Sequence, residues 1–157
     1  MSGSTFDHGD RVIRGMAHWE MEDQCNQDFA KLKDDDRFAW VGFCALIEDA
    51  TKGGVDLDES QVRCPLDFAP PKVHEPPWMG EFKVVGKKNG KKHWRLYFGE
   101  PINHQDLVVG VDLWHKLSSW TRAQTKTREA DAIAKAMGKL KWHFGTQGYV
   151  WSPLHPD

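Results

Sequence analysis

Residues 80–140 decide the fold, and they read GEFKVVGKKNGKKHWRLYFGEPINHQDLVVGVDLWHKLSSWTRAQTKTREADAIAKAMGKL. The pair Asn89-Gly90 supplies the two residues that a type I′ hairpin turn requires, because both must adopt a positive φ. Apolar runs flank this turn and predict strands over 81–85 and 92–98. A third, nearly continuous apolar run predicts a central strand over 107–114.

The second strand of the predicted hairpin has two chemically different faces, because successive side chains of a strand point to opposite sides. Its apolar face consists of Trp94, Leu96 and Phe98. Its polar face consists of His93, Arg95 and Tyr97. A half-buried strand directs its apolar set toward the core, so we expect the polar set to be exposed or to line a cleft.

Helices are expected on both sides of these strands. Apolar residues at helical spacing predict a helix over 128–141, with Thr127 as its N-cap. Upstream, the pattern predicts a short helix over 25–33 and a longer helix over 38–52 that ends before a Gly-Gly pair. Residues 16–23 are a candidate first strand.

The longer upstream helix has a broad apolar face that includes Phe38 and Val41, so we expect it to be well buried. Residues 55–79 hold five of the eight prolines and predict an irregular surface connection. We therefore expect a flexible leader over 1–15, a single domain over 16–144 and an aromatic, proline-rich tail over 145–157.

The order of these elements indicates the fold class. Helices gather toward the N-terminus and the hairpin and third strand follow, which is typical of α+β proteins. Strands joined by a tight turn are antiparallel. We therefore expect a small antiparallel sheet packed against the N-terminal helices, with one C-terminal helix.

Charge is distributed unevenly along the chain. Residues 1–71 hold 7 Lys and Arg against 15 Asp and Glu, whereas residues 72–143 hold 14 against 7. A basic half suggests an anionic partner, with nucleic acid as the first candidate, although charges segregated on a solubilising surface are the alternative. The residues expected to contact phosphates are Lys87, Lys88, Lys91, Lys92, Arg122, Lys126 and Arg128.

Several other classes of function find no support. No run approaches the length of a membrane span, and the N-terminus lacks the pattern of a signal peptide. Three widely spaced cysteines without a CxxC pair favour reduced thiols in the cytoplasm. Histidine spacing predicts no metal site, and no glycine-rich phosphate loop indicates a cofactor, so we expect none.

Four stretches resemble one protein family, the RelE/HigB superfamily of toxin-antitoxin mRNA interferases, and most closely its HigB-like, phage-associated branch. Residues 94–98 are similar to that branch's Tyr-Arg-Val-hydrophobic-Tyr-Phe strand, and residues 111–116 to its apolar strand that ends in His and Lys. Residues 124–134 resemble the entry of its last helix, and residues 36–54 resemble its second helix and the following glycine.

The resemblance implies a RelE-like fold and a metal-independent endoribonuclease that is controlled by an antitoxin and cleaves RNA either free or, as mRNA, on the ribosome. Two alternatives stay open. One is a non-catalytic module on the same fold that binds nucleic acid or a protein partner. The other is a toxin directed at gyrase, a role that the same fold also serves.

RNA cleavage without a metal requires a proton acceptor near the 2′-OH, cations for the developing phosphorane charge and a proton donor for the leaving oxygen. The residues of suitable type are Lys83, Arg95, Tyr97, His115 and Lys116. Histidine suits proton transfer near pH 7, and arginine binds phosphate bidentately. We expect Arg95 and His115 to face one surface, although each cation is equally compatible with a solvated or structural role.

Overall fold

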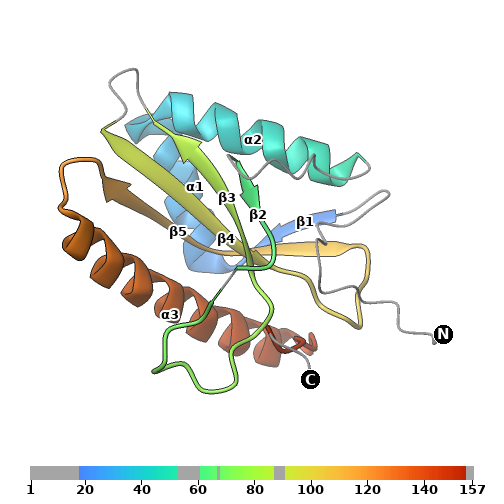
Figure 1. The fold of residues 1–157 in the computed structure, drawn as a ribbon. Coiled ribbons are helices and arrows are strands. Elements are labelled where there is room, and N and C mark those ends of the chain that lie inside the picture. Colours follow the sequence, from blue (N-terminus) through green and yellow to red (C-terminus); the bar gives the residue numbers. More distant parts are fainter. Residues whose placement is uncertain (1–17, 53–60, 67, 87–90, 155–157) are drawn as a thin grey trace.

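The computed structural model describes residues 18–52, 61–66, 68–86 and 91–154, which form a mixed five-stranded sheet between two helical layers (Figure 1). In chain order the elements are β1 (His18–Met21), α1 (Asp23–Asp35), α2 (Arg37–Thr51), β2 (Val62–Arg63), β3 (Gly80–Val85), β4 (Lys92–Gly99), β5 (Leu107–Leu117) and α3 (Arg122–Gln147). The predicted α+β class is confirmed.

The strand order is β1-β5-β4-β3-β2. Strands β2 to β5 pair antiparallel, as predicted for the last three of them, while the Asn89-Gly90 turn lies outside the described residues. Strand β1 is parallel to β5, with His18 beside Leu107. The prediction of a purely antiparallel sheet is therefore wrong at this edge. Strands β1 and β5 are far apart in sequence, so no tight turn imposes antiparallel pairing on them.

One face of the sheet packs against α1 and α2. Trp94, Leu96 and Phe98 all point into this layer, as predicted, and the ring of Phe98 lies 4.6 Å from that of Phe82 on β3. The helices contribute, among others, Leu32 and Phe43, both of which are almost fully buried. The alternation of apolar and polar residues along β4 therefore predicts correctly which of its side chains form this core.

Asp36 connects the two upstream helices to the sheet. It is buried at the junction of α1 and α2, and its carboxylate caps α2 by accepting a hydrogen bond from the Ala39 N–H at 3.2 Å. The same carboxylate accepts a hydrogen bond from the indole N–H of Trp94 at 3.0 Å. A Cβ atom on Gly86 would clash with this carboxylate, so a residue without a side chain is needed there.

Replacing Asp36 by alanine should lower the free energy of unfolding by about 2–3 kcal/mol. The variant loses a helix N-cap and leaves the buried indole N–H of Trp94 without this acceptor, and each effect costs about 1–2 kcal/mol. Urea denaturation would measure the change. Asp36→Asn is the matched control, because its single amide oxygen can keep one of the two hydrogen bonds, so it should lose less stability than the alanine variant. A change below about 0.5 kcal/mol in the alanine variant would contradict this role for Asp36.

The C-terminal helix is longer than predicted. Helix α3 begins at Arg122 rather than at residue 128, because Thr121 and Gln124 form a reciprocal capping box at its N-terminus. The proposed cap at Thr127 is therefore wrong. The helix ends at Gly148, whose φ of 73° lies in the left-handed region that glycine adopts without strain.

Helix α3 covers the second face of the sheet. Its residues Ile133, Met137, Leu140 and Phe144 pack with Tyr97, Val109 and Val111 in a second core. Arg95 is only 8% exposed, and Tyr97 is fully buried. The expectation that the polar face of β4 is exposed or lines a cleft is therefore wrong for Tyr97, which α3 covers, whereas Arg95 is buried in the wall of a hollow.

Helix α2 is more exposed than predicted. Phe38 and Val41, expected inside, have relative exposures of 64% and 54%. The apolar face of this helix is wider than the sheet area that it covers, so its outer margin reaches solvent. Within the connection predicted to be irregular, residues 62–63 form the short edge strand β2.

Candidate nucleic-acid interface

Four of the five residues proposed for RNA chemistry lie on the α3 side of the sheet. In the β3–β4 pairing Lys83 lies opposite Arg95, and Tyr97 lies opposite Glu81. In the β4–β5 pairing Lys116 lies opposite His93. Residues that face each other across paired strands project to the same side. Lys83, Arg95, Tyr97 and Lys116 are therefore brought to one face.

His115 lies on the other face. It pairs with Trp94, and the two rings are in contact, with centroids 4.7 Å apart and planes tilted by 52°. Burial, with a smaller contribution from the charge of Lys92, lowers the pKa of its imidazole. The prediction that Arg95 and His115 share a surface is therefore wrong.

A β-bulge is the physical reason for this error. The register between β4 and β5 shifts by one residue between Tyr97 and Phe98, where the partners change from Asp112 to Gly110 and Val111 is the extra residue. Without the bulge, the register that pairs Phe98 with Gly110 would continue along both strands and would place His115 opposite His93. A shift of one residue moves a side chain to the opposite face.

Arg95 interacts with a carboxylate that the sequence analysis did not identify. Its Nε lies 4.0 Å from Oε2 of Glu81, and its Nη1 donates a hydrogen bond to the Trp94 carbonyl at 3.1 Å. The Nε of Arg63 lies 3.7 Å from Oε1 of the same carboxylate. Glu81 is 4% exposed and so lies buried between two guanidinium groups. Side chains two positions apart on a strand share a face, so the sequence of β3 alone already places Glu81 on the same face as Lys83.

Glu81 has a perturbed acidity. Burial raises the pKa of its carboxyl above the usual 4.5, although the charges of Arg95 and Arg63 act in the opposite direction. Desolvation therefore outweighs the attraction of the two cations. A carboxyl shifted in this direction is better suited to exchange a proton near neutral pH than an exposed one.

Tyr97 is unsuited to direct chemistry. Its hydroxyl is buried and has no hydrogen-bond partner among the described residues. Burial, assisted by the negative charge of Glu81, raises the pKa of this phenol, so it keeps its proton. The side chain packs in the α3 core, where a base could not stack on it.

A hollow of about 600 Å³ lies at the end of β3 near α2. The polar residues that line it are Gln61, Lys83, His93 and Arg95. Its apolar wall includes the exposed Phe38 and Val41 of α2 and the end of β3. The hollow therefore connects solvent with the otherwise buried Arg95.

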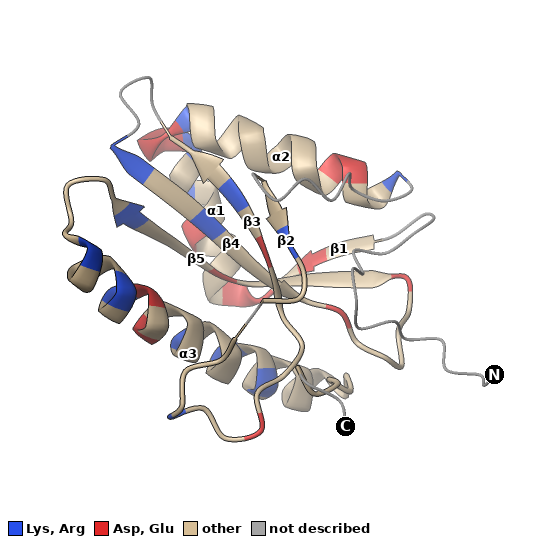
Figure 2. Ribbon diagram, in the orientation of Figure 1, with Lys and Arg blue, Asp and Glu red and all other residues tan. Residues whose placement is uncertain are grey.

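The cations expected to contact phosphate gather at one end of the sheet, where β4 begins, β5 ends and α3 begins (Figure 2). We call this surface the basic end, and it comprises Lys91, Lys92, Lys116, Arg122, Lys126 and Arg128. The proposed contacts Lys87 and Lys88 lie outside the described residues.

Contacts between the three segments hold the basic end together. The Ser118 N–H donates a hydrogen bond to the Lys91 carbonyl at 3.0 Å, which joins the start of β4 to the end of β5. The guanidinium of Arg128 lies 4.4 Å from the ring centroid of Trp120, which joins α3 to the preceding turn. Glu129 is the only acidic residue between positions 113 and 130, and it pairs with Lys116 at 3.7 Å. The part of the basic end that β5, the following turn and the start of α3 form therefore has an excess of positive charge.

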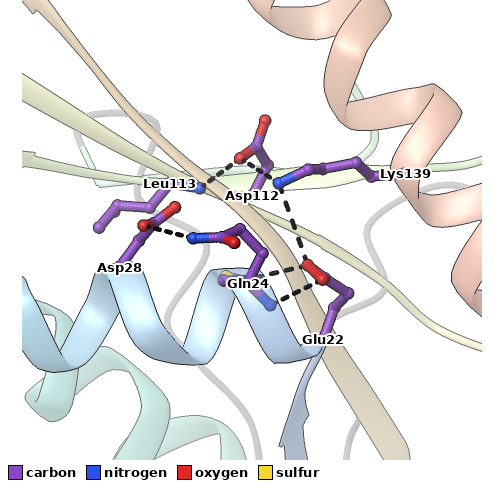
Figure 3. Close-up of polar contacts among 7 residues, drawn as sticks. Glu22, Gln24, Asp28, Asp112, Leu113 and Lys139 are labelled. Carbon is purple, nitrogen blue, oxygen red and sulfur yellow. Dashed lines mark hydrogen bonds and ion pairs between the residues drawn. The ribbon is translucent and has the colours of Figure 1, made fainter.

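A second polar cluster anchors the middle of α3 (Figure 3). The Lys139 ammonium lies 3.2 Å from Oδ1 of Asp112 and 4.0 Å from Oε2 of Glu22. Glu22 also caps α1, because its carboxylate accepts hydrogen bonds from the backbone N–H groups of Gln24 and Cys25. Burial raises the pKa of the Cys25 thiol, which keeps it protonated. These contacts tie α3 to β5 and α1, a structural role.

Within residues 18–52, 61–66, 68–86 and 91–154, no group of three or more His, Cys, Asp and Glu side chains is placed to bind a metal ion. No helix of the described chain combines the length and the apolar character required to cross a bilayer. Comparison with protein-family models, with curated proteins and with solved structures finds no match for this chain.

Proposed function

We propose that this protein binds nucleic acid, RNA in the first place, through the basic end. The convergence of six cations from three separate segments carries the proposal, since Glu129 is the only acidic residue in the sequence between positions 113 and 130. Lys and Arg that gather on one surface form the electrostatic footprint of a nucleic-acid-binding domain. Such contacts with the phosphate backbone position the strand and provide affinity without reading its sequence.

The salt dependence of binding tests this proposal. If the basic end neutralises about four to six phosphates, the logarithm of the affinity should fall with the logarithm of the salt concentration at a slope of roughly −3 to −5. Fluorescence anisotropy of a labelled RNA, titrated at several salt concentrations, would measure the slope. An uncharged polymer of similar size is the control ligand. Absence of RNA affinity at low salt would overturn the proposal.

A second candidate function is RNA cleavage, favoured by the buried carboxylate of Glu81 between two arginines. On this proposal Glu81 accepts the proton of the attacking 2′-OH, the P–O5′ bond breaks as the new P–O2′ bond forms, and the leaving 5′ oxygen takes its proton from water in the hollow, while Arg95 stabilises the charge that develops on the phosphate. Lys83, on the same face, adds positive charge. His115 no longer has a role in the chemistry.

The resemblance to RelE/HigB toxins supports this second candidate. The four stretches that carry the resemblance lie on α2, β4, β5 and the first half of α3. The RelE-like fold, control by an antitoxin and a phage association are therefore part of the same proposal. A gyrase-directed toxin remains the third possibility that the resemblance offers.

A further inference from the structure

The basic end contains a column of three flat groups. Trp114 on β5 and Trp120 in the following turn have ring centroids 6.1 Å apart, with their planes tilted by 45°. The guanidinium of Arg128 lies over the Trp120 ring, 4.4 Å from its centroid. Both tryptophans are partly buried, whereas Arg128 is exposed. The column therefore leads from the sheet to solvent and presents Arg128 at its outer end.

The column holds Arg128 in place at its outer end. A guanidinium over an indole ring gains a cation–π attraction. The planar group also loses less freedom on binding than a lysine side chain would. Arg128 forms no ion pair within the described part of the chain, because its neighbour Glu129 pairs with Lys116 instead. The outer surface of the guanidinium is therefore available to a flat ligand.

We infer that Arg128, supported by Trp120, is a stacking platform for an unpaired base, so that the nucleic acid bound here is single-stranded. Unpaired bases of RNA stack on aromatic rings and on arginine guanidinium planes. A duplex conceals the faces of its bases and offers only phosphates and groove edges. Arg122 and Lys126, in the first two turns of the same helix, are placed to contact the phosphates that flank the stacked base. This inference rests on the proposed binding function and specifies its ligand.

A comparison of three RNA ligands tests the inference on the unaltered protein. The ligands are a uridine 12-mer, an abasic 12-mer with the same phosphates, and a 12-base-pair duplex. The uridine strand should bind about 5- to 150-fold more tightly than the abasic strand, which is the range of stacking for one base. Equal affinity for the uridine and abasic strands would overturn the inference while leaving the binding function intact.

The variant Arg128→Lys separates stacking from charge. It keeps the positive charge and removes the planar group, so it should lose most of the preference for uridine over abasic RNA while binding the abasic strand within about twofold of wild type. Lys126→Ala is the matched control and should weaken the binding of the uridine strand and of the abasic strand by the same factor. Retention of the full preference in Arg128→Lys would overturn the role of Arg128. Failure of the wild type to bind any ligand at low salt would overturn the binding function and this inference together.

Discussion

Reversing two charges at the basic end, Arg122→Glu together with Lys126→Glu, should weaken RNA binding at about 50 mM salt by about 100-fold or more. Each phosphate contact contributes about one power of ten to the affinity at this salt concentration, because binding releases condensed counterions. The two glutamates add repulsion. Both residues are exposed on α3, so the fold should tolerate the change. Fluorescence anisotropy with a labelled single-stranded RNA would measure the loss.

The control for this experiment is the pair Lys31→Glu and Lys135→Glu. Both lysines are exposed and lie outside the basic end, on α1 and in the middle of α3. The net charge of the protein changes by the same amount in the two variants. The control should stay within about threefold of wild type if binding is local. Equal losses in the two variants would show that overall charge, rather than the basic end, determines affinity.

The variant Glu81→Gln should reduce RNA cleavage by about 100-fold or more if the second candidate function is correct, because an amide cannot accept the 2′-OH proton. Arg95→Ala should cost about 2–4 kcal/mol of transition-state stabilisation, which is typical for the loss of one charge-stabilising donor. Cleavage would be measured with and without ribosomes. His115→Ala should keep its activity, since that side chain lies on the opposite face of the sheet.

Controls are needed because Glu81 and Arg95 are both buried. Thermal melting of each variant would separate a chemical effect from unfolding, and Arg95→Lys provides a second variant that keeps a charge beside Glu81. If the wild-type protein cleaves no RNA with or without ribosomes, the proposal of an enzyme is excluded and the non-catalytic binding module is the function that is left. If expression arrests growth without RNA cleavage products, the gyrase-directed alternative gains support. If the protein cleaves RNA and Glu81→Gln cleaves it equally fast, Glu81 is not part of the active site.

Much of the candidate site was visible in the sequence. The charge asymmetry predicted a basic surface, and five of its proposed phosphate contacts, from Lys91 to Arg128, converge at one end of the sheet. The alternation of side chains along β4 correctly predicted that Arg95 and Trp94 lie on opposite faces of the sheet. Glu81 was not among the predicted site residues, although it lies two positions before Lys83 on β3 and therefore on the same face.

Local patterns determined which residues form strands and helices, and which side chains share a face within one strand, because these depend on a period of two or 3.6 residues. Only the tertiary structure decided how those faces combine. The extra residue Val111 shifts the register of β5 and places His115 opposite Trp94. Helix α3 buries Tyr97 because its apolar stripe needs a partner layer, and β1 pairs with β5, where His18 lies beside Leu107. Pairing register and layer packing arise from contacts between distant residues, which no local pattern encodes.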